Sequence, residues 1–534
     1  MKIKIYFILA LCVFFFGTAF AGPGIKDFSN FKKIPVLDNG RLKPLDTFAR
    51  SLLTQFSSQD HYEKQEASAW LASLFFNPDS TVNDKIFLID DPDIAVALGI
   101  KSEQDRHYTP SQLLQSYPLL VKLQQAAEKI PEKDRSLVEN EIIRVFDNIS
   151  FYKDLPFTVI PSSQNENWLS PWDALATDFG NEQTRRLVIL WGKMAVSYKQ
   201  GNDAAFNRAA QLYLNSVRYS LSKEDLKKVD RFPLELFYQA SSPFTWSIMF
   251  YIFAFIFFVV SFSSSKPLWY NLGLFSVVAG FIPHVLGIFM RIIIMARPPV
   301  SSLYETFIFV GFIAVFLGII IEYYNRQWLG IVTAAISGTA LLFIANKYSA
   351  EGDTLKVLVA VLNSNFWLAT HVTTITMGYA ATCVGGLLGH IWLLQAVFGK
   401  GNQILDKTYK TTLGILGVAL TLTFLGTNLG GIWADQSWGR FWGWDPKENG
   451  ALMIVLWTAL LFHAKAGQMI GPLGLAIGAV IGMMVVMWAW FGVNLLSVGL
   501  HSYGFTSGIA ASLIIYAVFE IIFLLVTTFF ICRK

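Results

Sequence analysis

Residues 304–324, YETFIFVGFIAVFLGIIIEYY, consist almost entirely of apolar and aromatic side chains. About 20 such residues in a helix cross the ~30 Å hydrocarbon layer of a membrane. The composition agrees, because hydrophobic residues make up 53% of the 534 residues and charged residues only 15%, with 45 Phe and 16 Trp. Such a balance favours burial in a bilayer over a soluble core. The sequence therefore predicts a polytopic membrane protein with an all-α fold.

Similar apolar runs lie on both sides of this one, beginning at Pro243. Each is long enough to cross a membrane as a helix. Together they predict a bundle of about nine membrane-spanning helices in residues 241–534. The expected spans lie near 244–262, 268–295, 304–324, 327–346, 367–398, 411–432, 450–466, 473–495 and 507–531.

The N-terminus has the pattern of an export signal. Lys2 and Lys4 precede a short apolar stretch, and the small residues of Ala19-Phe20-Ala21 suit a cleavage site. This arrangement predicts a signal peptide in residues 1–21. An uncleaved membrane anchor is the alternative, and both would place the following residues on the outer side of the membrane.

Residues 22–240 are mixed and polar in composition. Segments 111–130 (SQLLQSYPLLVKLQQAAEKI) and 181–200 (NEQTRRLVILWGKMAVSYKQ) have apolar residues at helical spacing. The region therefore predicts a mostly helical, extracytoplasmic soluble domain.

Nine crossings that start outside end inside, so the C-terminus is expected in the cytoplasm. Basic residues support this topology only in part, because the proposed outer loops also hold Arg297, Lys347, Lys356, Arg440 and Lys447. The net charge of +4 is too small to indicate nucleic acid as a partner. Basic residues of the proposed inner loops are Lys266, Arg326, Lys400, Lys407, Lys410, Lys465, Arg533 and Lys534.

The three cysteines are Cys12, Cys383 and Cys532, each in an apolar or terminal stretch. They provide neither a disulfide framework nor a CxxC redox pair. If thiol chemistry is involved, another protein must supply the thiols.

Two histidines are expected on the outer side of the membrane. His371 begins the fifth span, and His501 lies in the loop between the eighth and ninth spans. The tryptophan-rich segment (residues 431–449), between the sixth and seventh spans, is expected on the same side. Two imidazoles and an aromatic surface would therefore share one face.

Three more histidines lie within expected spans, where an imidazole needs a partner, a wet cavity or a metal. His463 is near the inner end of span seven, and His390 is toward the inner part of span five. His284 lies in span two, two helical turns before Arg291 and on the same face. For each of these histidines, a structural hydrogen bond to a neighbouring helix is the alternative to a ligand role.

The tryptophan-rich segment predicts a site for a flat ligand. Indole rings can stack on a planar apolar molecule, and their N–H groups can bond its polar margin. A ligand with an anionic edge and a metal that takes two axial imidazoles fits, and haem meets that description, with Arg or Lys for its propionates. Asp445 would cap the following helix or orient an indole. The candidate haem-binding residues are Trp433, Trp438, Gly439, Arg440, Trp442, Trp444, Asp445 and Arg291.

Four segments resemble one family. GIWADQSWGRFWGWDPKENGALM (431–453) is similar to the "WWD" signature of haem-handling proteins, in the form closest to CcsA, also called ResC, of system II cytochrome c biogenesis. The resemblance extends to RPPVSSLYET (297–306), NSNFWLATHVTTITMGYAA (363–381) and FGVNLLSVGLHSYGF (491–505). It covers roughly residues 245–531.

The resemblance implies that b-type haem crosses the bacterial inner membrane and is joined on the outer face to the CxxCH motif of an apocytochrome c. His371 and His501 match the axial ligands, and they and Asp445 are the candidates for the attachment step. His463 matches an intramembrane histidine on the path by which haem enters. His284 matches a further histidine region loosely, because Ile292 replaces a tryptophan, and it is kept as a candidate metal ligand.

The resemblance also implies partners. A separate ResB/CcsB-like membrane subunit is expected, together with a thioredoxin-like protein that reduces the client thiols, so that the chain would be part of a holocytochrome c synthase (haem lyase) complex. IPVLDNGRLKPLDTFAR (34–50) and ELFYQASSPF (235–244) are similar to a soluble segment that precedes the CcsA part in some fused versions. That region is expected to dock the ResB-like subunit or the apocytochrome.

Two other interpretations remain open. One is a different WWD protein, of the CcmF or CcmC type. The other is an unrelated transporter or channel whose tryptophans only anchor it at the membrane interface.

Overall fold

A computed structural model describes residues 24–131, 134–162, 168–264, 266–349, 352–358, 364–496 and 509–533. The expected signal peptide (1–21), Cys12 and His501 lie outside these residues. The chain forms two compact units, which are described separately. The first comprises the described residues up to Gln239 together with residues 352–357, and the second comprises the rest.

The first unit is mostly helical, as the sequence predicts. Segment 181–200 forms one helix, but segment 111–130 is divided into two, because Pro118 has no N–H for the preceding turn. The helices are α2 (Leu45–Ser57), α3 (Ala67–Phe76), α4 (Pro92–Ala97), α5 (Pro110–Gln115), α6 (Tyr117–Glu128), α7 (Leu137–Asp154), α8 (Pro171–Thr177), α9 (Glu182–Lys199), α10 (Asp203–Ser220), α11 (Lys223–Val229) and α12 (Phe232–Ser241), with 3₁₀ turns η1 (Phe31–Lys33) and η2 (Pro78–Ser80).

Three short antiparallel strand pairs complete the described part of this unit. The pair β1 (Pro35–Asp38) and β2 (Arg41–Pro44) is joined by Asn39 and Gly40, whose φ values of 47° and 75° suit the tight Asn-Gly hairpin turn. A second hairpin pairs β3 (His61–Tyr62) with β4 (Gln65–Glu66). The third pair joins β5 (Phe87–Leu88) to β6 (His107–Tyr108) across the intervening helix α4.

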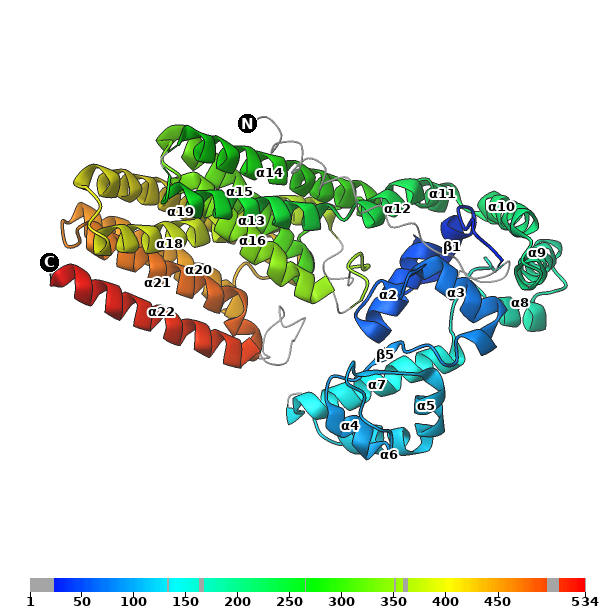
Figure 1. The fold of residues 1–534 in the computed structure, drawn as a ribbon. Coiled ribbons are helices and arrows are strands. Elements are labelled where there is room, and N and C mark those ends of the chain that lie inside the picture. The colour runs from blue at the N-terminus through cyan, green and yellow to red at the C-terminus, as the bar shows by residue number, and fades with distance from the viewer. Residues whose placement is uncertain are drawn as a thin grey trace. The chain divides into compact units, whose positions relative to one another are not determined.

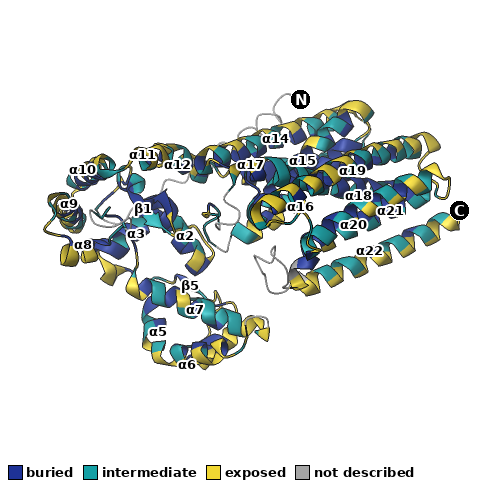
Figure 2. Ribbon diagram, turned by 180° about the vertical axis from the view of Figure 1, so that it is seen from behind, coloured by how far each residue is buried: buried dark blue, intermediate teal, exposed yellow. Residues whose placement is uncertain are grey.

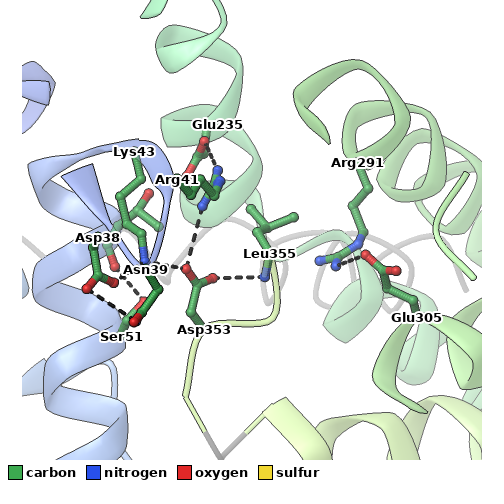
Figure 3. Close-up of polar contacts among 11 residues, drawn as sticks. Asp38, Asn39, Arg41, Lys43, Ser51, Glu235, Arg291, Glu305, Asp353 and Leu355 are labelled. Carbon is green, nitrogen blue, oxygen red and sulfur yellow. Dashed lines mark hydrogen bonds and ion pairs between the residues drawn. The ribbon is translucent and has the colours of Figure 1, made fainter. Parts of the chain in front are cut away.

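A buried ionic cluster joins residues 352–357 to the first hairpin (Figure 3). The ammonium of Lys43 lies 2.7 Å from the Asp38 carboxylate and 2.6 Å from that of Asp353. Arg41 pairs with Glu235 of α12. Burial alone would raise the pKa of Asp353, but Lys43 and Arg41 hold this pKa below its usual range. The cluster therefore fixes a loop distant in sequence onto β2.

The second unit contains nine helices, among the described residues, that are long and apolar enough to cross a membrane. The chain is therefore a multi-pass membrane protein. The helices are α13 (Pro243–Ser261), α14 (Pro267–Met295), α15 (Leu303–Asn325), α16 (Leu329–Ser349), α17 (Asn365–Trp367) with the π turn η5 (Leu368–Val372) and α18 (Thr373–Val397), α19 (Asn402–Trp438), α20 (Pro446–Ala466), α21 (Pro472–Trp490) and α22 (Ile509–Cys532), with a 3₁₀ turn η6 (Gly492–Leu496).

The nine predicted spans are confirmed, with one clear difference in length. Helix α19 has 37 residues, beginning nine residues before the predicted span 411–432 and ending six after it. At 1.5 Å per residue it is about 55 Å long, well beyond a ~30 Å apolar layer. Its polar and tryptophan-bearing ends are helical although they are not apolar. As a result, the first part of the tryptophan-rich segment is helix and not loop.

Helix pairs that are neighbours in sequence account for much of the packing. Helix α13 packs on α14 and α16, α15 on α16, and α18 on both α19 and α21. Helix α22 lies at the edge of the bundle, and the ribbons of α18 and α19 run side by side (Figure 1). The surfaces of α22 are largely exposed, whereas α18 is mostly buried or half-buried (Figure 2). Helix α18 is thus the central helix of the second half of the bundle.

Candidate functional site

His371 lies in the π turn η5, at the junction of α17 and α18. A π turn is closed by i→i+5 hydrogen bonds and so holds one residue more than an α turn, and such turns recur at functional sites in helices. The π geometry interrupts a stretch that otherwise reads as one continuous helix from Asn365 to Val397.

The imidazole of His371 is held by the neighbouring helix α19. Its Nδ1 lies 2.8 Å from the carbonyl oxygen of Gly426. Because a carbonyl oxygen can only accept, Nδ1 carries the proton and donates. In a neutral imidazole the lone pair then belongs to Nε2, which is the atom that would ligate a metal.

Two tryptophans extend the surface beside this histidine. The ring of Trp433, on α19, meets that of His371 edge-on at 5.8 Å between centroids and 61° between planes. The indole of Trp367 lies parallel to that of Trp433, with centroids 6.3 Å apart and 11° between planes. Trp367 also donates its N–H to Gln436 at 3.1 Å. The structure thus brings predicted residues His371 and Trp433 together and adds Trp367.

The turn after α19 packs around the guanidinium of Arg440. Gly439 ends the helix in the left-handed conformation, with φ 68°. The guanidinium of Arg440 lies 5.8 Å from the Trp438 ring centroid and 3.5 Å from the Glu448 carboxylate. A side chain at Gly443 would overlap this guanidinium, because a Cβ there would lie 1.1 Å from Nη1. Arg440 is therefore packed into the turn while its side chain keeps 32% exposure.

Trp442 and Trp444 stand perpendicular to each other. Their ring centroids are 6.0 Å apart and their planes meet at 88°. Trp444 is 70% exposed. A planar ligand can therefore lie flat on only one of these two indoles and must meet the other with its edge.

Asp445 caps α20. Its side chain accepts from the backbone N–H of Lys447 at 2.9 Å, and the side chain of Glu448 returns to the backbone N–H of Asp445 at 3.2 Å. This reciprocal pattern is a capping box. The ammonium of Lys447 donates to the carbonyl of Trp490 at 2.7 Å, which ties the start of α20 to the end of α21. Asp445 and Lys447 thus shape the turn that displays Trp444.

His463 lies at the opposite end of α20 from the tryptophan-rich segment. At 17 residues beyond Pro446, the separation along the helix is about 25 Å. The imidazole is exposed on the helix surface, and its Nδ1 donates to the carbonyl of Ala459 at 2.8 Å. His463 is therefore placed apart from His371.

His284 and His390 have polar partners inside the bundle. His284 is fully buried, with Nδ1 3.1 Å from the Tyr251 hydroxyl and Nε2 2.9 Å from the Ile308 carbonyl. A metal at His284 would have to displace one of these bonds. His390 lies 2.8 Å from the Glu520 carboxylate, which links α18 to α22.

Arg291 is engaged in a buried ion pair. Its guanidinium lies 2.9 Å from the Glu305 carboxylate and 4.9 Å from the Tyr304 ring centroid. Arg297 reaches the second oxygen of Glu305, also at 2.9 Å. Figure 3 shows Arg291 pointing from its helix to Glu305. These contacts account for the position of Arg291 without a propionate.

Sequence reasoning missed Trp367, Gln436 and the capping role of Glu448. The first stands four residues before His371, and Glu448 stands three after Asp445. The spacing of four was a usable signal for a shared helix face, and the spacing of three for a capping box. Nothing in the sequence marks Gln436.

The site offers few metal-ligating side chains, so it suits a metal whose other coordination positions are already filled by a bound organic ring. Among the residues that the structure describes, no group of three or more His, Cys, Asp or Glu side chains converges as a bare metal site. A single imidazole beside flat indoles could instead hold a planar metal complex whose ring occupies the equatorial positions. The residue types suit a haem, because His371 could ligate its iron, Trp444 could stack on its ring and Arg440 could pair with a propionate.

Comparison with known proteins identifies similar chains. Residues 300–501 match the family described as Cytochrome C assembly protein. Protein NrfI of Wolinella succinogenes is 25% identical over 505 residues, which are 87% of this chain and 53% of NrfI. The cytochrome c biogenesis protein CcsA is 32% identical over 216 residues in Chlamydomonas reinhardtii and 30% identical over 244 residues in Amborella trichopoda. These matches cover 39% of this chain in each case, and 61% and 78% of the two CcsA proteins. The chain thus spans about half the length of NrfI.

Proposed function

This chain belongs to the cytochrome c assembly protein family, and from that membership we propose that it binds haem beside His371 and presents it for covalent attachment to apocytochrome c. The observation that carries the proposal is the position of His371, which is held by the carbonyl of Gly426 and lies beside Trp433 in the helical first part of the tryptophan-rich segment. Haem is the substrate that is delivered, in its b-type form.

The imidazole of His371 would take one axial position of the haem iron. Its Nδ1–H donates to a backbone carbonyl, an arrangement that orients a ligating histidine and raises the basicity of its other nitrogen. His501 is proposed as the second axial ligand. Two neutral imidazoles would saturate the iron and so limit its reaction with oxygen before the haem is attached.

The tryptophan-rich segment would hold the porphyrin. Trp444, largely exposed, offers a face for stacking, and Trp442 offers an edge-on wall at 88° to it. Arg440 supplies a partly exposed cation for a propionate. Asp445 contributes by capping α20 and so by fixing the turn. Trp433, Trp438 and Gly439 would contribute to the same binding surface.

The attachment step is an addition of thiols to alkenes. Each cysteine S–H of the client CxxCH motif would add across a haem vinyl group, so that sulfur bonds to one vinyl carbon and hydrogen to the other. The chain would contribute orientation more than acid–base chemistry, because holding the vinyls beside the thiols raises their effective concentration. The client histidine would then replace one axial imidazole and permit release.

Partners and location follow from the same proposal. A ResB/CcsB-like membrane subunit, a thioredoxin-like reductant for the client thiols and the apocytochrome would act with this chain as a holocytochrome c synthase. The bacterial inner membrane would be the site of action, with the tryptophan-rich segment outside and the C-terminus inside. His463 would lie on the inner part of the path by which haem enters.

The test is the haem content of the purified chain from haem-replete cells. We expect a Soret band in wild type, loss of its bis-imidazole form in His371→Gly, and partial recovery when free imidazole is added. His61→Gly, at an exposed histidine of the first unit, is the control and should match wild type. A colourless wild-type protein, or His371→Gly with an unchanged spectrum, would contradict the proposal.

A further inference from the structure

The geometry points to Gly430 as a positioning residue for His371: its missing side chain, together with the carbonyl of Gly426, holds the imidazole in one orientation and one tautomer. The inference concerns how His371 is prepared for a ligand, and its functional meaning rests on the proposed function. Its structural part can be tested without haem.

The first observation is the contact between the imidazole and Gly430. A Cβ placed at Gly430 would lie 2.6 Å from Cε1, 3.0 Å from Nδ1 and 3.2 Å from Nε2 of His371. Contacts below 3.0 Å are not tolerated by real side chains, so even a methyl group would force the ring to move. The ring can therefore approach the backbone of α19 this closely only because residue 430 is glycine.

The second observation is that the ring is held on other sides as well. Gly426, one helical turn before Gly430, accepts the Nδ1–H bond at 2.8 Å. Trp433, three residues after Gly430, meets the ring edge-on at 5.8 Å. Residues spaced by four and three share one face of a helix. One face of α19 thus gives the imidazole a hydrogen-bond acceptor at Gly426, room for the ring at Gly430 and an aromatic contact at Trp433.

Other glycines of α18 and α19 have a different role. A Cβ at Gly426 would lie 2.7 Å from the backbone of Ile375, and one at Gly378 would lie 2.4 Å from Thr423. These two glycines let the helices approach each other. Gly430 instead faces a titratable side chain, and its nearest neighbours are all atoms of His371.

These contacts would fix the orientation and the tautomer of the His371 imidazole before it binds a metal. If the ring moved away from Gly430, its hydrogen bond to the Gly426 carbonyl would weaken, because the strength of a hydrogen bond falls as its angle departs from linearity. The imidazole could then adopt the other tautomer, in which Nε2 carries the proton and cannot bind a metal. An orientation fixed before the haem arrives avoids that loss.

The test compares three alanine variants of the full chain. Gly430→Ala changes the contact in question. Gly414→Ala is the matched control, because residue 414 is on the same helix and a Cβ there meets no heavy atom within 4 Å. Gly378→Ala disturbs the packing of α18 on α19 without contacting the imidazole.

The first readout is solid-state NMR of haem-free, ¹⁵N-histidine-labelled protein in lipid. The His371 signals are assigned by their absence in His371→Gly. We expect an Nδ1-protonated tautomer in wild type and in Gly414→Ala, and its loss or mixing with the other tautomer in Gly430→Ala. An Nε2-protonated His371 in wild type overturns the inference by itself, even if Gly430→Ala fails to fold. Unchanged His371 signals in Gly430→Ala overturn it as well.

The second readout is haem bound per membrane-inserted protein, with and without free imidazole. Gly430→Ala should bind at least fivefold less haem than Gly414→Ala, and added imidazole should recover part of it, because the small ligand replaces a misdirected side chain. Gly378→Ala should not respond to imidazole. If wild type shows the expected tautomer and binds no haem, the proposed function fails while the positioning role stands. If His371→Gly loses haem and Gly430→Ala does not, the positioning role fails while the proposed function stands.

Discussion

The guanidinium of Arg291 lies 2.9 Å from the carboxylate of Glu305, and both side chains are fully buried between α14 and α15. Sequence reasoning predicts Arg291 as a haem-binding residue, whose cation would pair with a propionate. The ion pair with Glu305 instead indicates a structural role for Arg291, and Arg297 pairs with the same carboxylate. The two roles make different predictions.

Glu305→Gln should destabilise the chain more than Arg291→Met does. The glutamine removes the carboxylate from two cations, whereas the methionine leaves Glu305 paired with Arg297. Loss of one partner of a buried ion pair costs about 3–5 kcal/mol, and thermal unfolding in detergent measures it. Asp406→Asn, which breaks the exposed pair with Lys410, should change stability by less than about 1 kcal/mol. If Arg291→Met unfolds like wild type yet binds less haem, the propionate role is right.

Trp444→Ala should weaken haem binding more than Trp442→Ala, because the exposed face of Trp444 is the one open for stacking. One aromatic contact contributes about 1 kcal/mol beyond its buried area, or about fivefold in affinity. Trp444→Phe should be mild. The measurement is haem per inserted protein, and Trp246→Ala, at a 45% exposed tryptophan of α13, is the control. A triple Ala variant of Trp438, Trp442 and Trp444 with wild-type haem content would show that these indoles only anchor the chain at an interface.

His463→Ala should leave little haem anywhere in the chain, whereas His371→Gly should retain haem that is easily oxidised. The reason is that His463 lies at the other end of α20 from the tryptophan-rich segment, so that it would act before the haem reaches His371. Haem content and the rate of oxidation in air distinguish the two variants. Leu460→Ala, one turn earlier and 55% exposed, is the matched control. Equal haem content in the two histidine variants would rule out an ordered path.

Asp84→Asn should change the pH dependence of the first unit. Burial raises the pKa of Asp84 to about 6, against the opposing bond from the indole N–H of Trp70 at 3.2 Å. The unfolded pKa is about 3.9, so the folded state binds the proton more tightly. The free energy of unfolding therefore falls as pH rises from about 4 to about 6, and levels off above that.

Hydrogen exchange of peptides that contain Trp70 measures this effect when wild type and Asp84→Asn are compared at each pH. Their protection should differ least near pH 4, and the variant should gain relative to wild type as pH rises to 7. Asp79→Asn, at an exposed residue nearby, should show no such trend. A constant difference between Asp84→Asn and wild type across this range would contradict the prediction.

Length and composition were sufficient to predict the nine spans, because a run of about 20 apolar residues is typical of a membrane-spanning helix and of few other structures. The placement of His371 near the tryptophan-rich segment also followed, since α18 and α19 are consecutive and antiparallel. The ends of α19 could not be predicted from an apolar pattern, because its polar ends are helical without being apolar. The residues LATHV of the π turn at Leu368–Val372 show no pattern that distinguishes them from an ordinary helical turn.

Side-chain pairing was the least predictable part of the site. Glu305 is fourteen residues from Arg291 and on another helix, so only the packing of α14 on α15 joins them. The 88° angle between Trp442 and Trp444 depends on the cap at Asp445 and on the turn through Arg440. Residue types can predict an aromatic surface, but the orientation of each ring is a property of the folded turn.

The π turn that holds His371 also divides its helix into two parts with different rotational phase. One additional residue in a helix rotates everything before it by about 100° relative to everything after it. Trp367 and the residues of α18 therefore do not obey a single helical wheel, and a deletion of one residue within 368–372 would restore one phase and turn the imidazole away from α19. If the sequence NFWLATH (residues 365–371) were placed in a regular α-helix, the same residues would be present but the histidine would point in another direction.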